Sequence, residues 1–124
     1  MAIVPVRRDA TGAKVTALHR GLLYLIRYHG SVTDGMREAN EKFLAYDRIP
    51  NRFGSATAAI VGMYQAQLVS RVKAKTKNNP DAVPDKFGGI PMTRGDTGNG
   101  AVDELTAEAL NWLVKEARAQ KRNS

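Results

Sequence analysis

The sequence predicts an all-α protein, a small four-helix bundle with a long Gly/Pro-rich loop before the last helix. A chain of 124 residues has the size of one domain, and 43% hydrophobic and 25% charged residues are typical of globular proteins. Four of its segments also repeat apolar residues at helical spacing. We therefore expect an extended basic N-terminal arm at residues 1–12 and a single helical domain at residues 13–124, with the loop at residues 78–100.

Two helices are expected before Pro50. The first covers about residues 13–28, and its apolar stripe consists of Val15, Leu18, Leu22, Leu25 and Ile26. Ser31 and Asp34 have the spacing of a capping box, which places the start of the second helix beside them. Glu38 and Lys42 are expected on the outer side of this second helix. Its expected buried stripe consists of Val32, Met36, Ala39, Phe43 and Tyr46.

The third helix is expected from about Ser55 to Lys75. Its main apolar face consists of Ile60, Val61, Tyr64, Leu68 and Val72. A row of small residues on the opposite side predicts that the first half is buried on two sides; it consists of Ala59, Gly62, Ala66 and Ser70. The segment "LVSRVKAKTK" also alternates like an exposed edge strand, and this alternative stays open, although a helix explains more of the surrounding sequence.

The fourth helix is expected at about residues 101–120, after the loop. It starts with acidic residues and ends with basic ones, as the helix dipole favours. Its expected buried residues are Val102, Leu105, Ala109, Trp112 and Leu113. The loop at residues 78–100 contains five Gly and three Pro, and a connection of this length is usually either functional or a mobile linker.

Several classes of protein do not fit the sequence. It contains no cysteine, so disulfides, thiolate metal sites and cysteine nucleophiles are absent. The N-terminus lacks the apolar core of a signal peptide, and the longest apolar stretch covers only residues 22–26, far less than a membrane span. We expect a cytoplasmic protein, or a virion component, that does not enter membranes.

The sequence also offers little for catalysis. The only histidines, His19 and His29, flank the apolar face of the first helix, and we expect both to be structural. No metal-binding motif is present, and "GDTGNG" lacks the lysine and the strand context of a phosphate-binding loop. We therefore predict a protein that is not an enzyme and that needs no cofactor or metal.

The basic residues point to a polyanionic partner. The net charge is +7, and the 33 residues between Asp47 and Asp81 contain no acidic residue. Within them "RVKAKTK" places four cations at alternate positions, which are Arg71, Lys73, Lys75 and Lys77. Repulsion among these cations is a cost in stability that contacts with phosphate groups would relieve. An acidic protein surface is the alternative partner.

A second set of candidate binding residues lies on the first helix, roughly opposite its leucine face. Arg20, Tyr24, Arg27 and Tyr28 share one stripe. A guanidinium group neutralises phosphate while a tyrosine ring stacks on a base, so this combination suits nucleic acid. The alternative is a solvated polar face with two half-buried tyrosines.

The segment "NRFGSATAAIVGMYQAQLVSRVKAK" resembles part of a known family. It opens with Arg52, Phe53 and Gly54, continues as a helix with a basic end, and follows a leucine-rich helix about thirty residues upstream. It is similar to the C-terminal region of the large subunit of type I CRISPR effector (Cascade) complexes, which is also made separately as a small helical subunit. The resemblance implies a helical bundle that lines an assembly and holds single-stranded DNA by its backbone, with Arg52 among the binding residues.

The leading hypothesis is a non-catalytic, basic nucleic-acid-binding subunit of a larger nucleoprotein assembly. It would contact phosphates largely without sequence specificity, with single-stranded DNA favoured and other protein subunits as neighbours. Two alternatives stay open. The chain could be a homo-oligomeric structural or assembly protein, such as a virion component, or a small inhibitor of an acidic host protein.

Overall fold

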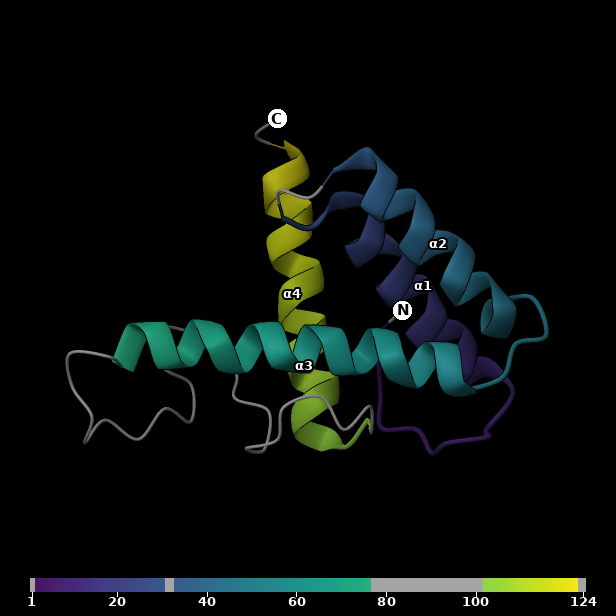
Figure 1. Cartoon of the computed structure of the whole chain (residues 1–124). Helices are drawn as coiled ribbons and strands as arrows, with labels where there is room; N and C mark the ends of the chain where they lie inside the picture. The colour runs from purple at the N-terminus through teal and green to yellow at the C-terminus, as the bar shows by residue number, and fades with distance from the viewer. Residues whose placement is uncertain (1, 31–32, 77–101, 123–124) are drawn as a thin grey trace.

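The described residues form four helices, and the all-α bundle expected from the sequence is confirmed. In the computed structural model α1 covers Ala13–Tyr28, α2 Asp34–Arg48, α3 Ser55–Thr76 and α4 Glu104–Arg122. The structure describes residues 2–30, 33–76 and 102–122, and of residues 69–76 and 122 it describes the backbone only. The expected loop at residues 78–100 therefore lies outside the described residues. Helix α1 packs against both α2 and α4, while α3 crosses in front of α4 (Figure 1).

Helix α1 supplies the centre of the hydrophobic core. Its predicted apolar stripe is buried along its whole length, and Val15, Leu18, Leu22 and Leu25 have no exposed surface. The side chain of Phe53, in the turn before α3, is also buried in this core. Each of these leucines contributes about 1.5–3 kcal/mol of hydrophobic stabilisation, which makes α1 the element on which the other helices assemble.

The N-terminal arm is extended and packs against α1 and α4. The backbone of Ile3 exchanges two hydrogen bonds of 2.8 Å with the side-chain amide of Asn111, and Val6 N donates to Val102 O. Ile3 also lies on Gly21 of α1, where a Cβ atom would come within 2.5 Å of the Ile3 side chain. Gly21 thus gives the Ile3 side chain room to lie directly on α1, and a larger residue would force that side chain to shift.

Helix α2 has the opposite orientation to the one predicted. Of the expected buried stripe, Met36 is 55% exposed, Phe43 42% and Tyr46 78%, and Ala39 is exposed as well; Val32 lies outside the described residues. The buried residues of α2 are instead Leu44 and Asp47. The Glu38–Lys42 ion pair, by contrast, forms on the outer side as expected, at 3.2 Å.

Polar contacts on the inner face of α2 explain this orientation. The guanidinium of Arg37 donates to the backbone oxygens of Ile26 and Gly30, so it caps the C-terminal end of α1. The carboxylate of Asp47 accepts hydrogen bonds from Gly54 N, Thr57 N and Thr57 Oγ1, so it caps the N-terminal end of α3. Asp47 satisfies N–H groups that would otherwise be buried without partners, Arg37 adds hydrogen bonds at a more exposed helix end, and both contacts form only when the polar face of α2 points inward.

Helix α3 follows the prediction closely, and the alternative of an edge strand is wrong because the backbone is helical as far as Thr76. Four residues of the expected apolar face are buried, namely Ile60, Val61, Tyr64 and Leu68; the side chain of Val72 is not described. The row of small residues is buried only at Gly62. Ala59 and Ala66 are exposed, and the side chain of Ser70 is not described. No second helix covers this row in the described part of the chain.

Two predicted helix starts need correction. The residue before α2 is Thr33, whose hydroxyl accepts a hydrogen bond from Met36 N, so Thr33 rather than Ser31 caps the helix. Helix α4 begins at Glu104 rather than near residue 101, because Asp103 caps it through Thr106 N. Val102 is buried as predicted, but it pairs with the N-terminal arm. Ala109 and Leu113 are buried within α4, whereas Leu105 and Trp112 are half-buried.

Candidate nucleic-acid interface

Two tyrosines of the predicted binding stripe meet two cations of α4. The rings of Tyr24 and Tyr28 lie 4.8 Å apart between centroids and are tilted by 55°. Lys121 Nζ lies 4.3 Å from the centroid of Tyr28 and 6.0 Å from that of Tyr24, and Arg118 Cζ lies 5.9 Å from the Tyr24 centroid. We call these four residues the tyrosine cluster. It combines aromatic surface and positive charge on one exposed face.

The packing of α1 on α4 creates the tyrosine cluster. The two helices run in the same direction, so their C-terminal ends lie together (Figure 1). His29 Nε2 lies 2.8 Å from the Glu116 carboxylate, and Gly30 N donates to Gln120 Oε1, which holds the two ends in register. Both helix dipoles place partial negative charge at this end, which stabilises the cations gathered there.

The other two residues of the predicted stripe lie on the α2 side of α1. Arg20 is exposed and borders a hollow of about 400 Å³, together with Arg48 and Asn51. Arg27 donates two hydrogen bonds to the Glu41 carboxylate of α2. These bonds raise the pKa of Arg27 and lower that of Glu41. The charge of Arg27 is therefore balanced within the molecule, and Arg27 is not part of the tyrosine cluster.

The predicted cations of α3 lie elsewhere. Arg71, Lys73 and Lys75 are on the last turns of α3, where only the backbone is described, and Lys77 lies outside the described residues. This end of α3 extends past α4 and away from α1 (Figure 1). Arg52 is exposed and pairs with Thr11 before the start of α1, roughly one helix length, or about 20 Å, from Tyr28. The nine predicted residues thus do not form one site.

The sequence did contain a signal for the α4 residues of the cluster. Lys115, Arg118 and Lys121 recur at every third position, and with Arg122 they give the last two turns four cations against one acid. Basic residues at this end also complement the helix dipole. Their spacing also places neighbouring cations on one side of the helix, which is what a binding surface requires.

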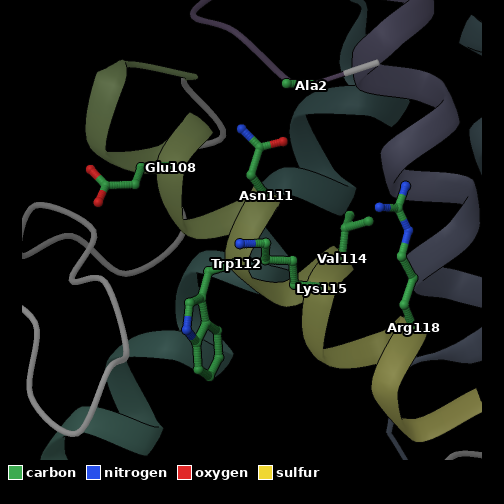
Figure 2. A pocket seen from close by; sticks show the side chains of 7 residues that line it. All are labelled: Ala2, Glu108, Asn111, Trp112, Val114, Lys115 and Arg118. Atoms are coloured by element: carbon green, nitrogen blue, oxygen red, sulfur yellow. The ribbon is translucent and has the colours of Figure 1, made fainter. Parts of the chain in front are cut away.

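A cavity of about 430 Å³ lies beside α4 and adjoins the tyrosine cluster through Arg118 (Figure 2). Its lining includes Trp112, Lys115 and Glu108, and Figure 2 shows the side chains of Trp112 and Glu108 apart from that of Arg118 along α4. The amide of Asn111 is already bonded to Ile3. The polar groups therefore do not converge on one point, and the cavity extends the basic and aromatic surface across α4.

The most connected polar group in the interior joins α1, α2 and α3. The Thr57 hydroxyl donates to Asp47 at 2.7 Å, so its lone pair faces His19 Nε2, 2.8 Å away, and His19 must carry its proton on Nε2. Gly54 permits this arrangement, because a Cβ atom there would lie 2.7 Å from the Asp47 carboxylate. A nucleophilic threonine would donate to the histidine and reach substrate. The Thr57 hydroxyl donates to Asp47 instead, and Thr57 is fully buried, so it cannot reach a substrate. We therefore interpret the group as structural.

The environment of His19 agrees with this structural role. Burial lowers the pKa of His19 below its usual value, with the Asp47 carboxylate acting in the opposite direction and Arg48 adding to the decrease. The ring is therefore neutral at physiological pH, and its Nδ1 atom is buried without a hydrogen-bond partner. Both histidines make hydrogen bonds inside the fold, as predicted.

Comparisons with protein-family models, with curated proteins and with solved structures find no match to this chain. The resemblance to the Cascade small subunit therefore stays a prediction. Across residues 2–30, 33–76 and 102–122, no three acidic or histidine side chains are grouped as a metal site would require. The helices of the same residues include none with the length and apolar character needed to cross a bilayer.

Proposed function

We propose that this protein is a non-catalytic, nucleic-acid-binding subunit of a larger nucleoprotein assembly. The observation that carries the proposal is the tyrosine cluster, in which Tyr24 and Tyr28 of α1 lie against Arg118 and Lys121 of α4. Aromatic rings bordered by cations suit a single strand, whose bases stack while its phosphates are neutralised. Single-stranded DNA or RNA is therefore the favoured ligand class.

The charges around the cluster support this assignment. Helix α1 contains no acidic residue. The only acid in the last two turns of α4 is Glu116, which is bonded to His29 at 2.8 Å. The positive charge of Arg118 and Lys121 lies at the exposed C-terminal ends of these two helices, where it can attract phosphate groups from solution.

The geometry also suggests how binding would proceed. Lys121 lies over the Tyr28 ring, so a base that stacks on this ring must displace the ammonium group. Once displaced, the lysine is close enough to pair with an adjacent phosphate. Contacts of this kind depend on the backbone and on the faces of the bases, which explains the expected lack of sequence specificity.

The Cascade-like segment adds the expectation that the protein works beside other subunits, and the cations of α3 would then bind a second part of the strand. A homo-oligomeric assembly protein is the second candidate function. The observation that favours it is the exposed apolar side of α2, where Tyr46 is 78% exposed.

The test is fluorescence anisotropy with labelled single-stranded DNA, duplex DNA and RNA of one length. Titrations at about 50 and 200 mM salt measure the number of phosphate contacts from the slope of log K against log salt. We expect the Arg118→Gln/Lys121→Gln variant to bind single strands more weakly and to reduce this slope by about 1.4, since each contact with a single strand contributes about 0.7. The Arg71/Lys73/Lys75/Lys77→Ala variant tests the α3 cations separately.

A matched control removes two charges elsewhere. Arg7 and Lys14 are exposed cations at the other end of α1 from the cluster, so the Arg7→Gln/Lys14→Gln variant has the same net charge as the test variant. Equal losses in the two variants would show that only net charge matters and would contradict the assigned site. Absence of binding by the wild-type protein at low salt would contradict the function itself.

A further inference from the structure

Helix α2 presents a row of large apolar side chains to solvent. We call this row the α2 apolar face; it consists of Met36, Ala39, Phe43, Tyr46 and Ile49. The four large members are 42–79% exposed, and Ile49 is the most exposed at 79%. Helix α2 contacts α1 and α3 and has no contact with α4, so it lies at the edge of the bundle (Figure 1). Isolated apolar residues on a surface need no explanation, but a continuous row of this size indicates a partner.

The spacing of the row indicates which kind of partner it fits. Positions 36, 39, 43 and 46 alternate steps of three and four residues, which is the a/d pattern of a coiled-coil seam. A seam this narrow matches the width of one helix. It is narrower than the broad apolar stripe by which a helix lies on a hydrophobic core.

Charge identifies the helix as one from a second copy of this chain. Two molecules of net charge +7 repel each other over most of their surfaces. Helix α2 is the least positive of the four helices: it contains four acids and three bases, whereas α4 contains three acids and four bases, and α1 and α3 each contain three bases and no acid. On the outer side of α2, Glu38 and Lys42 already form an ion pair of 3.2 Å. This is the helix surface at which two copies can approach without strong repulsion.

We propose that two copies of the protein form an antiparallel pair through the α2 apolar face, with a two-fold axis near residue 41. In this register Met36 packs against Tyr46 of the second copy, and Ala39 leaves room for Phe43 of the second copy. A two-fold axis repeats both contacts, so every member of the seam has a counterpart. Lys42 lies beside Glu38 of the second copy, and the two ion pairs of the separate chains become one group of four alternating charges.

The area of the α2 apolar face limits how tightly two copies can bind. The three large side chains that pair across the axis, Met36, Phe43 and Tyr46, form a patch of a few hundred Å², below the roughly 600 Å² per partner found in the smaller stable interfaces, so the dimer should be weak. We therefore expect a dissociation constant on the order of micromolar. The pairing leaves the tyrosine cluster accessible, since that cluster lies between α1 and α4, and the inference does not depend on the proposed function.

Sedimentation velocity of the full chain, from about 1 to about 200 μM, brackets a micromolar dissociation constant and tests the pairing directly. We expect a shift from monomer to dimer as the concentration rises. Phe43→Glu, at the centre of the seam, should weaken the dimer at least tenfold without unfolding the chain, because Phe43 is already 42% exposed. The matched control is Val4→Glu, which places the same charge at a 36% exposed apolar residue on the N-terminal arm and should leave the dimer intact.

A charge exchange tests the register. Lys42→Glu or Glu38→Lys alone places like charges together across the axis and should weaken the dimer, whereas the double exchange should restore it. Because the chain contains no cysteine, single-cysteine variants give an independent test. A mixture of Met36→Cys and Tyr46→Cys proteins should form the mixed disulfide in preference to either symmetric one.

Several outcomes would overturn the proposal. The first is a chain that stays monomeric at the highest concentration, even if its α2 apolar face then binds another protein. The second is a dimer that Phe43→Glu leaves intact. Preferential 36–36 and 46–46 disulfides would overturn the antiparallel register. Anisotropy measurements keep the two proposals separate. A Phe43→Glu variant that is monomeric but still binds single strands would show that the two surfaces act independently. A wild-type chain that binds strands but stays monomeric would contradict only the dimer, and one that dimerises but binds no strand would contradict only the proposed function.

Discussion

Helices α1 and α2 are nearly equal in length and both have an apolar side, but the fold uses these sides in opposite ways. The apolar stripe of α1 is buried, and Leu18, Leu22 and Leu25 have no exposed surface. The apolar stripe of α2 faces solvent, with Phe43 and Tyr46 both exposed. The inner side of α2 holds instead an arginine, a buried aspartate and a single fully buried leucine.

This difference shows that helix ends can decide how a helix is oriented. Arg37 satisfies carbonyl groups at the C-terminal end of α1, and Asp47 satisfies N–H groups at the N-terminal end of α3. Each buried polar group without a partner costs about 1–3 kcal/mol, comparable with the gain from burying one apolar side chain. With two helix ends to satisfy, the polar side of α2 is retained inside and the apolar side is left for another partner.

The largest contrast is expected between matched substitutions on the two stripes. Leu22→Ala in α1 should lower the free energy of unfolding by about 2–5 kcal/mol, because it removes packed methyl groups and leaves a cavity. Tyr46→Ala in α2 should change it by less than about 0.5 kcal/mol at concentrations where the chain is monomeric, since Tyr46 is mostly exposed. Urea denaturation followed by circular dichroism measures both values.

The two variants control for each other, because each truncates a large side chain of a helix to alanine. A loss above about 2 kcal/mol for Tyr46→Ala in the monomer would mean that the α2 apolar face is buried inside the chain. That result would reverse the comparison between the two helices.

The second contrast concerns the polar side of α2. Asp47→Ala should destabilise the protein by about 2–4 kcal/mol, because Gly54 N and Thr57 N lose their buried acceptor at the start of α3. Asp47→Asn keeps an amide oxygen at the same place and should cost less. A loss below about 0.5 kcal/mol for Asp47→Ala, in the same urea experiment, would contradict the role of helix ends in orienting α2.

The sequence predicted those parts of the fold that depend on local pattern. The spacing of apolar residues identified all four helices, the buried face of α1, and most of the buried face of α3. It could not predict the orientation of α2, because the partners of Arg37 and Asp47 lie in other helices and periodicity carries no information about them. Met36, Phe43 and Tyr46 form a helical stripe in either case, and only the tertiary contacts decide which side it faces.

The candidate site shows the same limit. Tyr24 and Tyr28 could be chosen from the sequence because an arginine and a tyrosine recur on one side of α1. Arg118 and Lys121 join them from the other end of the chain, through the packing of α1 on α4. Arg27 was chosen as well, but its partner Glu41 comes from α2, and this ion pair removes it from the cluster. Which charges are balanced inside a molecule depends on contacts between elements, and these are visible only in the structure.

The smallest expected effect is a pH dependence of the free energy of unfolding. It comes from His19 of α1, which is connected through Thr57 to Asp47 of α2. Burial lowers the pKa of His19 in the folded protein, whereas in the unfolded chain it is about 6.5, so the unfolded chain binds more protons in this range. Stability should therefore be complete above about pH 6.5 and should decrease as the pH falls below this value toward the folded-state pKa. Protonation of His19 also places a second positive charge near Arg48, and the repulsion between them further lowers stability at low pH.

Urea midpoints between about pH 8 and pH 5 measure this decrease for the wild-type protein and for His19→Gln. Glutamine can still donate a hydrogen bond to Thr57 but does not titrate, so the variant should show a flatter profile across this range. The remaining slope reports the other titratable groups of the chain. Parallel profiles for the two proteins would mean that His19 binds a proton as readily in the folded chain as in the unfolded one. The buried link from α1 through Thr57 to Asp47 would then not restrict protonation, and the inner side of α2 would be more open to water than the contacts of Asp47 indicate.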